Sequence, residues 1–228
     1  MVEDILNFYS METGNFKLDI DWFSARELLE ETIDLFKLQC DLKNIALKLD
    51  IDHMLSEKHV CSDRNRTKQV LMNLLSNALK FTFQGGIFVK ARLIKDFDRE
   101  EFLEFEISDT GIGIKEEDHQ NLFKPFGMMT NNNGISATGW GIGLTMTQKY
   151  AEMLGGDIYL QSEYGTGTNV RFNIHNQTSY KSSETADMSI SGDSLRVPDE
   201  SIKNSRSENI KNFKFNAIRM ASLNKAQN

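Results

Sequence analysis

The sequence predicts an α/β protein: a two-layer α/β sandwich in which helices cover one face of a mostly antiparallel, mixed sheet. Segments with apolar residues at helical spacing are interspersed with short strand-like segments. Two pairs of these strand-like segments follow one another along the chain, as expected for antiparallel hairpins. Because each helix has one apolar face, packing the helices on one side of the sheet gives two layers.

The first region, residues 1–21, is expected to contain the last turns of a helix, a glycine stop at Gly14 and a strand. Before the glycine, apolar residues recur at helical intervals, at Val2, Ile5, Leu6 and Tyr9. After it, apolar and polar residues alternate, with the apolar ones at Phe16, Leu18 and Ile20. An ordinary amphipathic N-terminal helix explains the helical periodicity equally well.

The second region, residues 22–175, is predicted to be the globular domain. Ser24 and Glu27 have the form of a capping box, so a helix is expected from there to about Gln39. Further helices are expected over residues 65–81, 116–122 and 142–154, the last one stopped by two glycines. Strands are expected over residues 44–51, 87–93, 102–107, 157–162 and 169–174.

The third region, residues 176–228, is rich in serine, asparagine and mixed charge, and it has few apolar residues. We expect this region to be a disordered linker or tail, because it cannot bury enough apolar surface to offset the loss of chain entropy. One short segment of this region, Ile210–Met220, is basic and weakly amphipathic. The alternative for this segment is that it becomes a helix when it binds a partner.

Composition excludes some classes of protein. The net charge of −7 argues against nonspecific binding of nucleic acid, which depends on dense lysine and arginine. Cys40 and Cys61 have no metal-binding or redox spacing, so reduced thiols facing the cytosol are expected. No apolar run approaches the roughly 20 residues that span a bilayer. We therefore expect a cytoplasmic location, which is compatible with a membrane-anchored parent protein if the chain is a fragment.

Two glycine clusters are the most informative feature of the chain. Asp109 follows an apolar segment and precedes Gly111 and Gly113, and a second cluster within residues 139–144 opens a helix. Glycines let the backbone approach a ligand closely and turn its amides toward that ligand. The start of a helix adds unpaired N–H groups that suit phosphate. Together the clusters predict a nucleotide pocket, although the first cluster alone is equally well explained as a tight turn.

Two asparagines stand out in the helix expected over residues 65–81. Asn73 and Asn77 lie four residues apart beside the apolar stripe of the helix, so they share one face, with Lys80 and Phe81 one turn further on. Asparagine is a poor residue for a helix interior, because its side chain competes for backbone hydrogen bonds. Magnesium bound to nucleotide phosphates takes few protein ligands, and amide oxygens suit it. The alternative is two solvated or internally bonded asparagines.

These elements, in this order, closely resemble the catalytic ATP-binding domain of sensor histidine kinases, within the GHKL ATPase superfamily, whose fold is of the Bergerat type. The resemblance covers roughly residues 1–175 and rests on four ordered motifs. It implies that the cofactor is contacted by Asn73, Asn77, Lys80, Phe81, Asp109, Gly111, Gly113, Ile114, Phe123, Phe126, Gly139, Gly141, Gly143, Leu144 and Thr168.

The resemblance also implies what these residues do. Asp109 would accept a hydrogen bond from the adenine amino group of ATP, and Thr168 would lie near the adenine. Asn77, helped by Asn73, would hold Mg²⁺, and Lys80 would face the phosphates, so Asn73 and Lys80 are the predicted catalytic residues.

The expected ATP lid, residues 115–139, departs from the pattern of the family. Many sensor kinases carry a basic residue in the lid, whereas residues 127–138 of this chain contain no lysine or arginine. Phosphate charge would then be neutralised by Lys80, magnesium and backbone amides.

By the same resemblance, the chain would transfer the γ-phosphate of ATP to a histidine on a dimerisation domain, in cis or in trans. The expected setting is a phosphorelay with a response-regulator receiver domain, and the parent protein is expected to be a homodimeric kinase, of the hybrid type. Residues 1–21 would be the end of the dimerisation hairpin and its linker strand. Related ATPases have a water-activating glutamate where this chain has Asn73, and an amide is no general base, which favours transfer over hydrolysis.

The phosphoacceptor itself is predicted to be absent from this chain. None of the four histidines, His53, His59, His119 and His175, has the expected setting on a long hairpin helix. Two alternatives therefore stay open. One is a non-catalytic nucleotide-binding or docking module, and the other is a GHKL ATPase or serine kinase.

Overall fold

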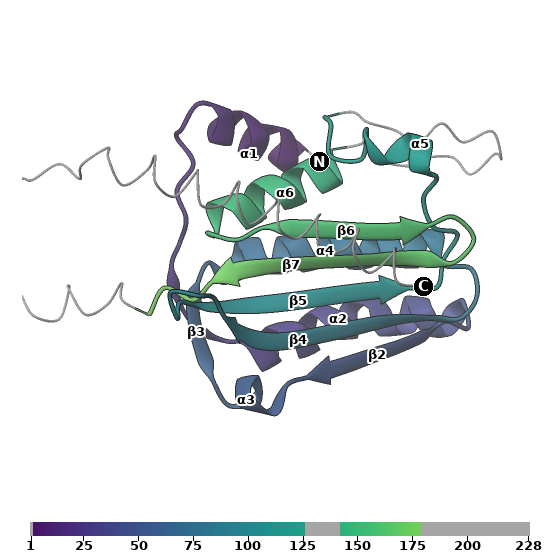
Figure 1. The fold of residues 1–228 in the computed structure, drawn as a ribbon, viewed down its shortest axis with the longest axis horizontal. Helices are drawn as coiled ribbons and strands as arrows, with labels where there is room; N and C mark the ends of the chain where they lie inside the picture. Colours follow the sequence, from purple (N-terminus) through teal and green to yellow (C-terminus); the bar gives the residue numbers. More distant parts are fainter. Residues whose placement is uncertain (1, 126–141, 179–228) are drawn as a thin grey trace, which may run out of the picture. The chain divides into compact units, whose positions relative to one another are not determined.

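The computed structural model of the protein describes residues 2–125 and 142–178, drawn in colour in Figure 1. The helices in these ranges are α1 Val2–Glu12, α2 Ala25–Leu42, α3 His53–Ser56, α4 Arg64–Phe81, α5 Glu116–His119 and α6 Gly143–Met153. The strands are β1 Asp21–Ser24, β2 Ala46–Ile51, β3 His59–Ser62, β4 Gly86–Lys95, β5 Glu101–Asp109, β6 Ile158–Glu163 and β7 Gly167–His175.

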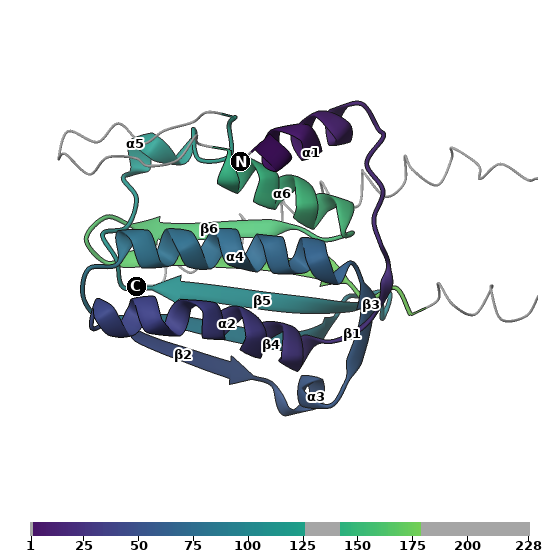
Figure 2. The ribbon, with the colours of Figure 1, turned by 180° about the vertical axis from the view of Figure 1, so that it is seen from behind.

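Five of the strands form one mixed sheet in the order β2-β4-β5-β7-β6. Only β2 and β4 run parallel, and the other neighbouring pairs are antiparallel. Helices α2 and α4 lie side by side on one face of this sheet, behind it in Figure 1 and in front of it in Figure 2. The predicted two-layer α/β sandwich is confirmed.

The two long helices begin at side-chain caps that are visible in the sequence. The Ser24 hydroxyl accepts a hydrogen bond from the backbone N–H of Glu27, which is one of the two bonds of the predicted capping box. The Asp63 carboxylate accepts in the same way from Arg66 N at 2.9 Å and caps α4. These caps satisfy backbone donors that an uncapped helix end leaves unpaired.

The core lies between the sheet and its helices. Alternate residues of β5, namely Leu103, Phe105 and Ile107, point into it and are almost fully buried. Phe105 stacks on Phe172 of β7, with their ring centroids 4.8 Å apart. Since burying each such side chain stabilises the fold by about 1.5–3 kcal/mol, this alternation fixes the register of the central strands. It thereby fixes the strand ends that carry the site.

The prediction of a strand directly after Gly14 is wrong. Residues 15–20 form no strand, and β1 begins at Asp21. The backbone N–H of Asp19 donates to Asp63 Oδ2 at 2.9 Å, so a side chain takes the place of a neighbouring strand. The apolar alternation there instead reflects Phe16 and Leu18, which are half-buried against the core.

A second, two-stranded sheet was not predicted from the sequence. In it β1 pairs antiparallel with β3, which places Phe23 beside Val60. His59 is the first residue of β3 rather than a loop residue. Each strand has four residues, which is too short for a periodic signal, and their partners are far apart along the chain.

The N-terminal segment packs against α6, and α1 lies beside α6 in both Figure 1 and Figure 2. The Lys149 ammonium of α6 pairs with Glu12 and lies 4.9 Å from the centroid of the Phe8 ring. The Arg66 guanidinium lies over the rings of Phe16 and Tyr150, at 4.7 and 5.5 Å. The segment therefore contacts both helices, α4 and α6, that border the candidate site.

The fold continues past the predicted end of the domain. Asn176 is buried, and its side-chain amide accepts a hydrogen bond from Cys61 N and donates one to Glu101 Oε2. Most of the predicted lid, with Phe126, Gly139 and Gly141, lies outside the described residues. Residues 179–228 of the predicted tail lie outside them as well.

Candidate functional site

The candidate site is built around Asp109, the last residue of β5. Asp109 lies opposite Thr168 of β7, and its Oδ1 accepts a hydrogen bond from Gly111 N at 2.8 Å. Partial burial raises the pKa of the Asp109 carboxyl, while the backbone N–H groups of Gly111 and Thr168 oppose this by stabilising the charged form. The result is a partly desolvated carboxylate held in place by two backbone donors.

The glycines that follow Asp109 are required by close backbone packing. A Cβ at Gly111 would lie 2.5 Å from the carbonyl oxygen of Phe81 and 2.7 Å from Asp109 Oδ1. Gly113 has a φ of +64°, and a Cβ there would lie 2.0 Å from the carbonyl oxygen of Glu163. The turn is therefore held tightly between the end of α4 and the turn that joins β6 to β7.

Hydrogen bonds hold the second side of this turn. The backbone N–H of Ile114 donates to Ser162 Oγ at 2.8 Å, and that hydroxyl lies 2.9 Å from Thr168 Oγ1. Gly165 N donates to Ile112 O at 2.7 Å. These contacts bring the predicted residues Ile114 and Thr168 together with Asp109, although they come from distant parts of the chain.

Asn73 and Asn77 lie on α4, and both are half-buried. Asn73 Nδ2 lies 3.5 Å from Thr147 Oγ1 of α6, a long hydrogen bond, and Thr147 Oγ1 donates to Gly143 O at 2.9 Å. The amide oxygen of Asn73 is the atom of this side chain that can bind a cation, and the NH₂ group on the other side lies near Thr147. Asn73 therefore faces the beginning of α6.

The last turn of α4 connects the asparagines to the glycine turn. Lys80 Nζ lies 5.0 Å from the centroid of the Phe81 ring, in cation–π contact. The carbonyl oxygen of Phe81 accepts a hydrogen bond from Ile112 N at 3.1 Å. Asn77 is one helical turn before Phe81, so α4 brings its amide to the same end of the sheet as Asp109.

The remaining predicted residues lie around the first turn of α6. Phe123 is half-buried, and its carbonyl oxygen accepts a hydrogen bond from Thr145 Oγ1 at 3.1 Å. Leu144 packs against the core. Gly143 is exposed, and among the described residues no atom lies within 4 Å of a Cβ built there. In the described part of the chain, sterics therefore require glycine at position 111 but not at position 143.

Sequence reasoning missed the hydroxyl groups that form hydrogen bonds between the elements of the site. Thr145 and Thr147 are buried in α6, and Ser162 is half-buried in β6. Threonine and serine are common in such elements, so their type alone indicates nothing. The available signal was position, since Thr147 lies four residues after Gly143 and thus on the same helix face.

Within residues 2–125 and 142–178, no cluster of three or more histidine, cysteine, aspartate and glutamate side chains could hold a metal ion. In the same ranges no helix is long and apolar enough to cross a membrane.

Comparison with known proteins gives the family. Residues 62–178, about half of the chain, match the family described as histidine kinase-, DNA gyrase B-, and HSP90-like ATPase. The chain belongs to this family. The match includes α4, the glycine turn after Asp109, and Thr168, the elements that form the candidate site, so the resemblance found in the sequence is confirmed.

Individual relatives of this ATPase family agree with the assignment. The chain is 37% identical over 174 residues to the autoinducer 2 sensor kinase/phosphatase LuxQ of Vibrio cholerae, covering 76% of this chain and 20% of LuxQ. It is 32% identical over 174 residues to hybrid signal transduction histidine kinase B of Dictyostelium discoideum, covering 76% of this chain and 9% of that protein. The chain thus spans a fifth or less of these two relatives.

Solved structures support the fold assignment. The chain is similar to the catalytic domain of histidine kinase ThkA, with a TM-score of 0.58 and 27% sequence identity. The similarity covers 70% of this chain and 97% of that one. The described fold therefore corresponds to a nearly complete histidine kinase catalytic domain.

Proposed function

We propose that this chain is the ATP-binding catalytic part of a protein-histidine kinase, which transfers the γ-phosphate of ATP to a histidine on a dimerisation domain in phosphorelay signalling. Membership of the ATPase family and similarity to sensor kinases support the proposal. The observation that carries it is the Asp109 carboxylate, held by backbone amides beside a glycine turn.

The base of the nucleotide binds at Asp109. A carboxylate accepts hydrogen bonds only, so it selects adenine, which presents an amino group, over guanine, which presents a carbonyl at the equivalent position. Gly111, Gly113 and Ile114 form one wall of this subsite, and Thr168 closes it beside Asp109. Phe81, Phe123, Phe126 and Leu144 would complete its apolar surroundings.

The phosphates bind between α4 and the start of α6. Asn77, assisted by Asn73, would hold Mg²⁺ through amide oxygens; the Asn73 NH₂ group lies 3.5 Å from Thr147 Oγ1, on the side away from that oxygen. When bound, the ion neutralises charge on the transferred phosphoryl group. Lys80 contributes a second positive charge, and by the family resemblance the glycines at 139, 141 and 143 would supply backbone amides.

Asn73 also favours transfer over hydrolysis. Its amide has no basicity at neutral pH and does not activate water. Catalysis by this chain therefore consists of holding the nucleotide and neutralising its charge, with Asn73 and Lys80 as the catalytic residues.

The acceptor comes from another domain. His53 begins α3, His59 begins β3 and His119 ends α5, while His175 Nε2 lies 3.3 Å from Glu100 Oε2. A dimerisation domain, in cis or in trans, therefore supplies the acceptor histidine, and a receiver domain takes the phosphate from it. On this proposal residues 1–21 are the end of the dimerisation hairpin, the catalytic domain extends from residue 22 past the predicted end at 175 to residue 178, and the rest of the predicted tail is a linker. The parent protein is a homodimer that works in the cytoplasm, where ATP is available.

Calorimetric titration of a non-hydrolysable ATP analogue, with and without magnesium, tests the nucleotide site. Asp109→Asn should weaken binding at least tenfold, because loss of a charged hydrogen bond costs about 1.5–3 kcal/mol. Asp50 is exposed, so Asp50→Asn is the matched control and should leave the affinity for the ATP analogue unchanged. Asn77→Asp should change the ratio of the affinities for the ATP analogue measured with and without magnesium. Equal affinities for wild type and Asp109→Asn would refute the assignment of the base subsite.

The transfer reaction needs a separate assay. Labelled ATP should label a dimerisation domain added in trans, and the chain alone should acquire no acid-labile phosphate on its own histidines. Steady-state hydrolysis without any acceptor would instead indicate an ATPase, and binding without transfer would indicate a docking module.

A further inference from the structure

Helix α2 has two apolar faces rather than one. One face is buried in the core and consists of Ala25, Leu28, Leu29, Thr32, Ile33, Phe36 and Cys40. The other consists of Leu35, Leu38 and Leu42, with exposed fractions of 53%, 69% and 76%. Their spacing of three and four residues aligns them along one side of the helix. We call these three residues the leucine strip.

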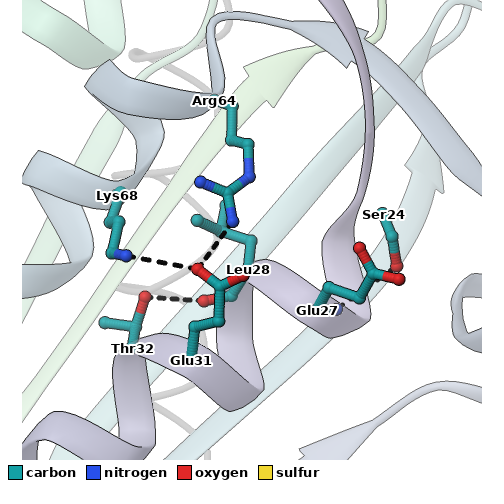
Figure 3. A network of polar contacts seen from close by, with 7 residues as sticks. All are labelled: Ser24, Glu27, Leu28, Glu31, Thr32, Arg64 and Lys68. Carbon is teal, nitrogen blue, oxygen red and sulfur yellow. Dashed lines mark hydrogen bonds and ion pairs between the residues drawn. The ribbon is translucent and has the colours of Figure 1, made fainter.

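Ion pairs connect α2 with α4 beside the leucine strip. At one end Glu31, one turn before Leu35, pairs with Arg64 at 2.7 Å and with Lys68 at 3.3 Å; Figure 3 shows both basic side chains directed at the same carboxylate. The basic side chains lower the pKa of Glu31, mainly through their hydrogen bonds. The leucine strip therefore lies on a helix whose opposite face is buried in the core.

The apolar surface continues at the other end of α2. Lys43, directly after Leu42, donates from Nζ to Leu79 O at 2.7 Å and lies 6.0 Å from the centroid of the Phe83 ring. Phe83 follows the end of α4 and has an exposed fraction of 53%. The Lys43 side chain thus connects the end of α2 with the exposed Phe83 ring at the end of α4.

Helix propensity does not explain the strip. Leucine is a good helix former, but lysine, glutamate, glutamine and arginine are nearly as good. Any of these would form the exposed face of α2 equally well without exposing apolar surface to water. Three leucines on one exposed face therefore indicate that another surface covers them.

One edge of the strip, on the side of Leu38, is acidic, whereas Arg64, Lys68 and Lys43 lie on the side of α4. Glu27, Asp34 and Asp41 follow one another at intervals of seven residues and form a row beside Leu38. Over its whole length α2 has five acidic residues and two basic ones. Asp34 pairs with Lys37 at 2.6 Å, but both side chains are largely exposed, so this pair opens readily in favour of a partner's charge.

We propose that the leucine strip is a docking site for a basic amphipathic helix of a separate protein. Apolar side chains of that helix cover Leu35, Leu38 and Leu42, and its lysine or arginine residues pair with the acidic row. A second copy of this chain fits less well, because two acidic rows would face one another. No residue of the candidate nucleotide site lies on α2, so this inference stands independently of the proposed function.

The probe is a synthetic helical peptide of about 18 residues with leucines on one face and flanking lysines, and a second peptide carries glutamates in place of the lysines. Fluorescence anisotropy of the labelled peptides measures binding to the full chain. We expect the lysine peptide to bind at least tenfold more tightly than the glutamate peptide. Equal binding of the two peptides, or no binding of the lysine peptide, would overturn the proposal.

Substitutions at Leu38 locate the contact. Leu38→Glu and Leu38→Lys both remove the apolar side chain and keep helix propensity, but only lysine repels a basic helix. The expected order of affinity for the lysine peptide is wild type, then Leu38→Glu, then Leu38→Lys, with at least a tenfold loss for the last. A reversed order of the two variants would exclude a basic partner.

Two controls complete the test. Phe97→Lys replaces another large apolar residue, with an exposed fraction of 92%, outside the leucine strip and should leave peptide affinity unchanged. Both Leu38 variants should retain the wild-type affinity for the ATP analogue if that site is intact. In sedimentation experiments the wild-type chain should remain monomeric, and a dimer that Leu38→Lys dissociates would assign the leucine strip to self-association instead.

Discussion

Replacing Gly113 by alanine tests how the glycine turn is built. Gly113 has a φ of +64°, a region that costs an L residue about 1–2 kcal/mol. In addition, the new Cβ would lie 2.0 Å from Glu163 O and 3.1 Å from Tyr164 Cα. Both atoms are backbone and cannot rotate away, so the turn must shift, which adds about 1–3 kcal/mol. We therefore expect Gly113→Ala to lower the free energy of unfolding by about 2–5 kcal/mol.

Gly165 provides a matched control for this prediction. It also has a positive φ, +86°, but no atom of the described residues lies within 4 Å of a Cβ built there. Gly165→Ala should therefore cost only the backbone term, about 1–2 kcal/mol. Urea unfolding of the two variants and the wild type measures both values. Because Ile114 and Thr168 depend on this turn, Gly113→Ala should also weaken nucleotide binding more. Equal stability losses in the two variants would refute the reasoning.

Two more predictions follow from single contacts. Thr147→Val removes the hydroxyl near Asn73 and should weaken nucleotide binding about fivefold with magnesium present and little without it; an equal loss under both conditions would contradict the role of Asn73. A hydrogen bond from Lys58 at 2.5 Å lowers the pKa of the Glu101 carboxyl in the folded protein. The contact therefore stabilises the fold fully at pH values above the ordinary pKa of glutamate, and this stabilisation is lost as the pH falls through the lowered pKa. Glu101→Gln should cost about 1 kcal/mol in urea unfolding at pH 7 and nothing below that lowered pKa.

Local signals in the sequence were sufficient for the main helices and for the central strands. The capping residue Ser24 and the apolar stripe of α4 depend only on nearby residues, and so do the alternating residues of β5. The small sheet of β1 and β3 was missed for the opposite reason, since its pairing connects short segments far apart in the chain. The Phe16 alternation was misread because the Asp63 side chain replaces a strand partner.

The candidate site shows the same division. Glycines and asparagines at distinctive spacing point to Asp109 and Asn73 from the sequence alone. The hydroxyls of Thr147 and Ser162, which connect these parts, carry no such pattern, because their importance comes from tertiary contacts. Sequence reasoning therefore found the residues proposed to contact the ligand more readily than those that orient them.

The donors that hold Asp109 belong to the main chain, at Gly111 and Thr168. Point mutations other than those to proline keep these N–H groups, and Gly111 has no room for a side chain. Consequently, few substitutions around that carboxylate would give resistance to an inhibitor that occupies the adenine subsite and donates a hydrogen bond to Asp109. Replacing Asp109 itself would be the direct route, and on the proposed mechanism that change also sacrifices the natural nucleotide.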